Sequence, residues 1–160
     1  MTHSPSPEVA ISALVFRYAE LIDSGDFEGI GELFRDATID TGNGELIGGA
    51  DAVRRMYEDN TIRYPDNGTP HTRHVTSNLI VNVSDDGTTA TCRSYVVVFQ
   101  RLDDFPLQPV WTNRYEDRFE YVDGSWRFTH RRMTDHLPGD TSRHLYPPAA
   151  LNLGPDQNAS

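Results

Sequence analysis

The chain has 160 residues, of which 37% are hydrophobic, and a formal charge of −10 without any basic block. This length fits a single domain with a sizeable core. The acidity argues against nucleic acids and anionic membrane surfaces as partners, because both are bound through basic patches. Cys92 is the only cysteine, which excludes an intramolecular disulfide and a cysteine-based zinc site.

The N-terminal residues show neither the basic nor the apolar region of a signal peptide. No apolar run in the sequence approaches the length of a membrane span. We therefore expect a cytoplasmic protein.

The first part of the chain predicts helices. Residues 1–7 are rich in serine and proline and are expected to be loose. From Glu8 apolar residues recur at helical spacing, and Ser24-Gly25 ends this helix. Asp26 is a suitable N-cap for a second helix.

Two short strands and a third helix are expected next. Residues 37–47 indicate two strands around the turn signal Thr41-Gly42-Asn43-Gly44. Gly48-Gly49 breaks the chain before a helix over residues 50–63.

The second half predicts strands joined by hairpin turns. The expected strands are residues 72–83, 88–101, 110–122 and 125–136, with a loop that holds Pro106 and Pro109 before the third of them. Residues 138–160 hold several prolines and predict an extended tail, which leaves residues 8–137 as the folded domain.

Helices first and strands afterwards indicate an α+β fold rather than alternating βαβ units. We expect a cone-shaped, curved antiparallel sheet, with the three helices of the N-terminal half lying across its concave side. Such an arrangement encloses a pocket.

One predicted strand has an aromatic face that should line this pocket. Trp111 and Tyr115 lie on that face, together with Phe119 and Tyr121. Asn113 interrupts it, as does residue 117, an aspartate, and polar groups on an apolar face need partners. We therefore expect Trp111, Asn113 and Tyr115 to contact a ligand.

Asp23 and His74 are the candidates for acid–base chemistry, and we expect both to line the pocket. Asp23 follows an apolar pair near the end of the first helix, and His74 begins a strand. A histidine paired with a buried carboxylate is a common general base. Taken singly, Asp23 is more often an exposed helix end or a cap, and His74 is more often a surface or structural histidine.

Further polar groups could complete the site. Strict alternation turns Arg131 away from the apolar face of its strand, but a bulge would bring it to the pocket. Tyr18, Tyr57 and Tyr95 could present hydroxyl groups to a ligand, although core packing explains each of them as well.

Three segments in this order resemble the SnoaL-like domains of the nuclear transport factor 2-like superfamily. They are YAELIDSGD at residues 18–26, TRHVTSN at residues 72–78 and DGSWRF at residues 123–128 followed by Arg131. The similarity spans about residues 8–137 and is nearest to the branch of scytalone dehydratase and the lindane dehydrochlorinase.

The resemblance implies a catalytic pair at Asp23 and His74 and a pocket arginine at Arg131. Where the dehydrochlorinase has a lysine, this chain has Tyr18, which makes dehydrochlorination itself doubtful. The implied activity is a lyase or isomerase without metal or organic cofactor, acting on a small apolar cyclic substrate. A polyketide cyclase-like enzyme and a noncatalytic binding or scaffold subunit are the alternatives, and a homodimer or homotrimer is expected.

Overall fold

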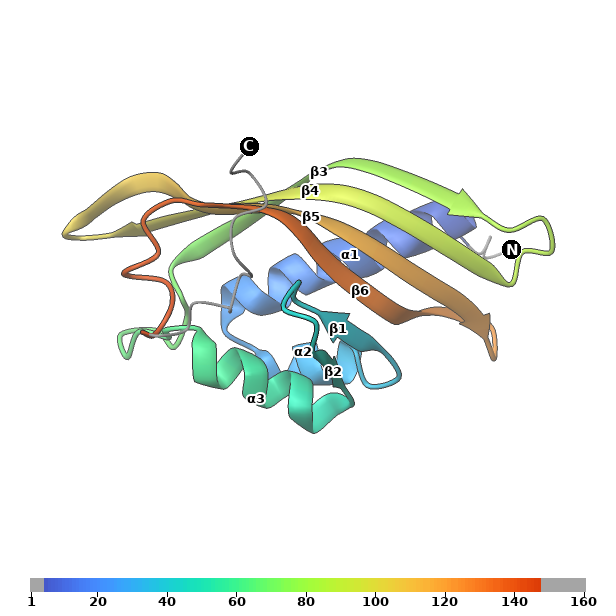
Figure 1. Ribbon diagram of the computed structural model, residues 1–160, viewed down its shortest axis with the longest axis horizontal. Helices are drawn as coiled ribbons and strands as arrows, with labels where there is room; N and C mark the ends of the chain where they lie inside the picture. The colour runs from blue at the N-terminus through green and yellow to red at the C-terminus, as the bar shows by residue number, and fades with distance from the viewer. Residues whose placement is uncertain (1–4, 148–160) are drawn as a thin grey trace.

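The computed structural model describes residues 5–147, which form three helices and six strands (Figure 1). In chain order they are α1 (Pro7–Ser24), α2 (Phe27–Leu33), β1 (Thr38–Asp40), β2 (Leu46–Gly48), α3 (Ala50–Asn60), β3 (Thr72–Val83), β4 (Thr89–Leu102), β5 (Phe105–Val122) and β6 (Ser125–Pro138). The predicted α+β order is confirmed.

All six strands belong to one open sheet with the order β2-β1-β6-β5-β4-β3. The strands from β3 to β6 pair as successive antiparallel hairpins. β1, however, pairs with β6 in parallel, so the prediction of a purely antiparallel sheet is wrong in this detail. No hairpin turn joins β1 to β6, and the helix α3 and four strands lie between them in the chain, which permits the parallel direction.

Helix α1 begins and ends where local chemistry requires. The Ser6 hydroxyl accepts a 3.5 Å hydrogen bond from the Val9 backbone N–H at the N-terminus. Gly25 closes the helix with φ of 73°, a left-handed conformation that glycine adopts without strain. A Cβ on Gly25 would lie 2.4 Å from the Gly68 carbonyl oxygen, so no other residue fits there.

The other two helices follow the predicted caps only in part. The Asp26 carboxylate accepts a 2.8 Å hydrogen bond from Gly29 N–H and caps α2 as expected. Helix α3 ends at Asn60 rather than at residue 63, because Thr61 is extended and forms a β-bridge with Leu145.

Strand β5 begins at Phe105, well before the predicted residue 110. The prolines at 106 and 109 had indicated a loop. Pairing of β5 with β6 reaches only as far as Trp111 opposite Pro138, so residues 105–109 pair with β4 alone. That stretch is a sheet edge, where proline is tolerated.

The core lies between the helices and one face of the sheet (Figure 1). Val15 of α1, Phe34 after α2 and Phe128 of β6 are almost fully buried, and the rings of Phe34 and Phe128 lie 4.6 Å apart. Burial of one such side chain contributes about 1.5–3 kcal/mol. Cys92 is also buried, and burial raises the pKa of its thiol to about 11, as expected for an unreactive cysteine.

After β6 the chain returns to the helical side, so part of the predicted tail packs against the domain. We call residues 139–147 the C-terminal segment; in Figure 1 its red end reaches the end of α3. Ile62 N–H donates to the His144 carbonyl at 2.9 Å, and Tyr146 N–H donates to the Asn60 carbonyl at 3.0 Å. Residues 148–160 of the predicted tail lie outside the described residues.

None of the helices within residues 5–147 combines the length and the apolarity that crossing a membrane requires.

Candidate active site

Asp23 and His74 are in contact, as the sequence predicted. Asp23 is near the C-terminus of α1, and His74 is near the start of β3, which packs on that helix. The His74 Nδ1 lies 2.7 Å from Asp23 Oδ1. The backbone N–H of His74 donates to Oδ2 at 2.8 Å, and the Thr72 hydroxyl donates to Oδ1 at 2.7 Å. Three hydrogen bonds from one strand therefore hold this carboxylate in a single orientation.

The electrostatics of the pair keep Asp23 ionised. Burial raises the pKa of the Asp23 carboxyl, but the hydrogen bonds and charge of His74, together with the Thr72 hydroxyl, lower this pKa by more, so it falls below its usual value. An ionised carboxylate only accepts hydrogen bonds, so Nδ1 of His74 carries a proton. In the neutral imidazole the Nε2 lone pair is then free to accept a proton.

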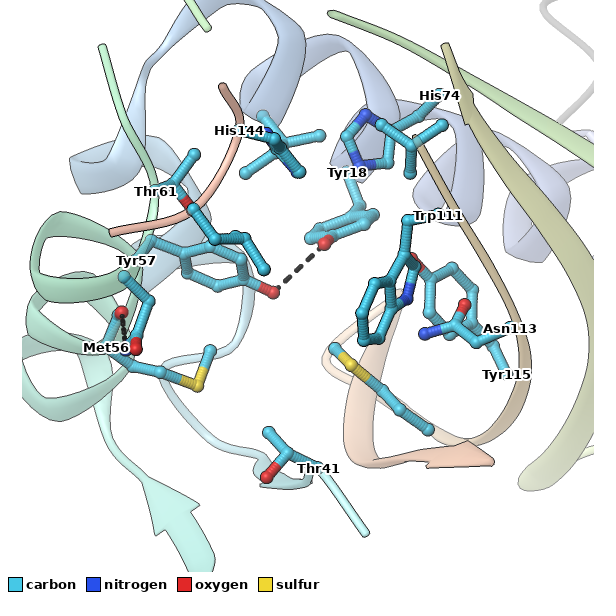
Figure 2. A pocket seen from close by; sticks show the side chains of 15 residues that line it. Tyr18, Thr41, Met56, Tyr57, Thr61, His74, Trp111, Asn113, Tyr115 and His144 are labelled. Atoms are coloured by element: carbon cyan, nitrogen blue, oxygen red, sulfur yellow. Dashed lines mark hydrogen bonds between the residues drawn. The ribbon is translucent and has the colours of Figure 1, made fainter. Parts of the chain in front are cut away.

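The His74 side chain is 5% exposed and lines a cavity of about 80 Å³ between the sheet and the helices (Figure 2). The apolar part of the lining is formed by Ile22, Met56, Val98, Trp111, Met133 and Leu145. Asp23 is not part of this lining. It lies behind His74 and borders a separate surface groove with Arg73 and Arg101, so the expectation that both members of the pair line one pocket is wrong for Asp23.

Two tyrosine hydroxyls meet inside the cavity. The Tyr57 hydroxyl donates to the Tyr18 hydroxyl at 3.0 Å, drawn as a dashed line in Figure 2. Burial raises the pKa of both phenols, and the Arg131 charge only partly offsets this for Tyr18. Both are therefore protonated, and Tyr18, which accepts from Tyr57, keeps its own hydroxyl proton for another acceptor.

Trp111, Asn113 and Tyr115 line the cavity from β5, where their aromatic face was predicted to lie. The Oδ1 of Asn113 is buried and has no hydrogen-bond partner within residues 5–147. Buried polar atoms are normally paired, so this atom is a candidate contact for a ligand.

Arg131 reaches the interior through the kind of bulge that the sequence suggested. The register of β5 and β6 shifts between Arg118 and Phe119, and the Arg131 side chain is fully buried. Its Nε and Nη2 each donate to the Asp117 carboxylate at 2.8 Å. The guanidinium carbon lies 4.0 Å from the Tyr115 ring centroid and 4.5 Å from that of Tyr18. Arg131 is thus placed behind two wall residues and does not line the cavity.

Tyr95 does not contribute to the pocket, so its prediction as a ligand contact is wrong. It is 41% exposed on the outer face of the sheet, where Arg114 Nη2 donates to its hydroxyl at 3.1 Å. The alternation of β4 turns Ser94, Val96 and Val98 inward and Tyr95 outward.

His144 lines the cavity and was missed by the sequence analysis. It belongs to the C-terminal segment, which had been assigned to the tail. The signal that could have found it is the apolar pair Leu145-Tyr146 directly after it, which is unusual for a solvated tail.

His144 should make stability depend on pH. Burial, with a further contribution from His74, lowers its pKa from 6.5 to about 3. Between pH 6.5 and about pH 3 the His144 ring is protonated in the unfolded chain and neutral in the folded chain. The contribution of this group to the free energy of unfolding is therefore complete above pH 6.5 and is lost as the pH falls toward 3. Linkage predicts a loss of about 2 kcal/mol between pH 7 and pH 5 from this group alone.

Urea unfolding of the wild type and of His144→Phe at both pH values measures this effect. The wild type should lose more stability at pH 5 than the variant by about 2 kcal/mol. His71→Gln, which changes a histidine outside the cavity, should behave as the wild type. Equal pH dependence of wild type and His144→Phe would contradict the prediction.

Within the described residues, no group of three His, Cys, Asp or Glu side chains could hold a metal ion.

The curved mixed sheet with three helices over one face and a cavity between them defines a nuclear transport factor 2-like protein. The sequence profile of the SnoaL-like domain matches residues 6–132, which is most of the chain. The chain therefore belongs to the SnoaL-like domain family, as the sequence analysis indicated.

Solved structures with the same fold agree with this assignment. The chain is 27% identical to a variant of Rv3472, a protein of unknown function from Mycobacterium tuberculosis, with a TM-score of 0.64 over 84% of this chain and 74% of that one. An NTF2-like protein with a cystatin-like fold from Novosphingobium aromaticivorans is 23% identical, with a TM-score of 0.65 over 79% of each chain. A candidate scytalone dehydratase from the same species is 24% identical, with a TM-score of 0.61 over 82% of this chain and 86% of that one. No curated protein matches the chain.

Proposed function

We propose that the protein is a cofactor-independent lyase or isomerase that acts on a small, largely apolar cyclic substrate. The observation that carries this proposal is the Asp23–His74 contact of 2.7 Å, which lies at the edge of an apolar cavity. Membership of the SnoaL-like family, and a fold shared with a candidate scytalone dehydratase, support a dehydratase-type reaction.

In the proposed mechanism His74 is the general base. Its Nε2 removes a proton from a carbon next to an electron-withdrawing group of the substrate. Asp23 fixes the ring orientation through Nδ1 and stabilises the imidazolium that forms. This role requires no contact between Asp23 and the substrate, which agrees with its place behind His74.

Tyr18 is the proposed partner of the developing negative charge. Its hydroxyl already accepts a hydrogen bond from Tyr57, so its own proton can point to a substrate oxygen. The Arg131 guanidinium behind the Tyr18 ring places a positive charge near this oxygen without touching the substrate. We therefore assign Arg131 a positioning and electrostatic role rather than a catalytic contact.

Proton removal and return need only a base, an acid and a site with little water. For this reason neither a metal nor an organic cofactor is part of the proposal.

The small volume of the cavity supports a noncatalytic function as the alternative to an enzyme. Ligand pockets usually enclose about 300–1,000 Å³, whereas this cavity measures about 80 Å³. A noncatalytic subunit that serves as a scaffold, or that binds a molecule smaller than a typical substrate, would fit such a cavity without any base chemistry.

Hydrogen exchange distinguishes the two functions. A panel of small cyclic ketones is incubated with the protein in D₂O, and loss of the proton signal next to the carbonyl is followed by NMR. A base at His74 should catalyse exchange with at least one member, whereas His74→Gln should not, and His71→Gln should match the wild type. Saturable binding of ketones with no exchange above the rate of His74→Gln would favour the binding function.

We also propose that the chain forms a homodimer or homotrimer. The outer face of the sheet carries the exposed apolar side chains Val75, Tyr95 and Leu107, and exposed apolar surface of this kind marks interaction sites. Light scattering at micromolar concentration should give two or three times the chain mass of 18.0 kDa, and a monomer would refute the proposal.

A further inference from the structure

His144 enters the cavity beside the C-terminal end of α3, from a segment that is fixed on both sides. The β-bridge of Leu145 with Thr61 and the hydrogen bond from Ile62 N–H to the His144 carbonyl hold the segment at the end of α3. On the sheet side, Gln100 Nε2 donates to the Arg143 carbonyl at 2.8 Å. Gln100 is itself fully buried and also donates to the Pro70 carbonyl at 2.9 Å.

The imidazole of His144 is buried, but its hydrogen-bonding capacity is not used within the described part of the chain. The residue is 6% exposed, and its Nδ1 has no hydrogen-bond partner among residues 5–147. Structural histidines in protein interiors normally bond through at least one ring nitrogen to a protein group. The backbone around His144 is fixed, and a ring nitrogen next to the cavity lacks a hydrogen-bond partner among these residues. We therefore expect the ring to form a hydrogen bond with a ligand that occupies the cavity.

The place of this ring relative to His74 defines what it could contact. The two ring centroids lie 6.4 Å apart and the ring planes are inclined by 64°, and both side chains border the same cavity (Figure 2). A ligand group bonded to His144 is therefore close to the atom on which His74 would act. A neutral imidazole offers one donor and one acceptor, which matches a hydroxyl group better than a carboxylate or an ammonium group.

We infer that His144 is a specificity-determining residue of the site, which binds a hydroxyl group on the ring of the substrate near the carbon that His74 deprotonates. The inference rests on the proposed function only for the identity of that carbon, because the binding itself requires no chemistry. The lowered pKa of His144, caused mainly by burial, agrees with it, since the ring stays neutral throughout the physiological range.

Phenol and benzene are suitable probes, because they differ only by the hydroxyl group. Binding of each to the full chain is measured by titration while the ¹⁵N resonances of the histidine side chains are recorded. Phenol should shift a ring nitrogen of His144, and benzene should not. The wild type should prefer phenol by about 3–10-fold, which is the range for one hydrogen bond.

Variants assign the preference to this residue. His144→Phe should lose the preference, His144→Gln, which keeps a donor and an acceptor, should retain part of it, and His71→Gln should leave it unchanged. Far-ultraviolet circular dichroism verifies that each variant is folded, and if His144→Phe is not, His144→Gln and the wild-type ¹⁵N shifts decide.

Equal affinity for both probes in the wild type would overturn the inference, as would no binding of phenol up to its solubility limit. A preference for phenol without a shift of His144 would assign the hydroxyl to another group, such as Tyr18 or Asn113, and would overturn it as well. None of these results depends on proton removal by His74, so they are distinguishable from a failure of the proposed function, which the exchange experiment in D₂O reports.

Discussion

His74→Ala should lower kcat/KM by about 10²–10⁴-fold on a substrate that the wild type converts, because it removes the general base. The Asp23 carboxylate accepts a hydrogen bond from the side chain and another from the backbone of His74, so only the first is lost in the variant. The fold should therefore survive, and steady-state kinetics together with a urea unfolding curve separate lost chemistry from lost structure.

Asp23→Asn provides the second half of this test. The amide keeps the shape of the carboxylate but can present a donor to Nδ1, which favours the wrong tautomer of His74 and removes the charge that stabilises the imidazolium. We expect a loss of orders of magnitude here too. Because the two residues act as one unit, the double variant should be little worse than the more damaged single variant.

Thr72→Val is the matched control for Asp23. It removes one of the three hydrogen bonds to the carboxylate and leaves both bonds from His74 in place. Its effect on kcat/KM should be far smaller than that of Asp23→Asn. If the losses of the two single variants multiply in the double variant, Asp23 and His74 act independently, and the proposed base is not oriented by Asp23.

Local chemistry explains most of what the sequence predicted of the fold. Helix caps, glycine turns and the alternation of strands depend on neighbours in the chain, which a single sequence displays. Asp26 caps its helix as expected, and the interior arginine was correctly linked to a bulge. The parallel pairing of β1 with β6 was missed, because no local signal sets the direction of two strands that are far apart in the chain.

The site was predictable where motifs of the family carried it, and where the alternation of one strand did so for Trp111, Asn113 and Tyr115. The contact between Asp23 and His74 follows from two such motifs. Tyr95 was chosen for its hydroxyl although strand alternation places it opposite Val96 and Val98, which the structure turns inward. The apolar pair after His144 indicates only that its segment packs somewhere, because the position of the ring depends on a return of the chain to Thr61 and Gln100.

The buried ion pair of Arg131 with Asp117 gives the largest expected effect on stability. Both side chains are 0% exposed and are joined by two hydrogen bonds of 2.8 Å. Burial lowers the pKa of Arg131, but the charge and hydrogen bonds of Asp117 raise it by more, so the guanidinium remains charged. Removal of one partner leaves the other as an uncompensated buried charge. Arg131→Met and Asp117→Leu should each lower the free energy of unfolding by about 3–5 kcal/mol.

The double variant and a neighbouring residue make this prediction specific. Arg131→Met combined with Asp117→Leu leaves no unpaired charge and should be more stable than either single variant, since apolar replacements of buried ion pairs are often tolerated. Arg132 is the control: its side chain is 55% exposed and lies 3.6 Å from Asp40, so Arg132→Met should cost about 0–1 kcal/mol. Urea unfolding measures all four variants.

If the double variant is as unstable as the worse single variant, packing of the guanidinium against the rings of Tyr18 and Tyr115, rather than pairing of charges, is what the core requires. If the double variant is stable but inactive on a substrate that the wild type converts, the Arg131 charge behind Tyr18 serves the reaction and not the fold.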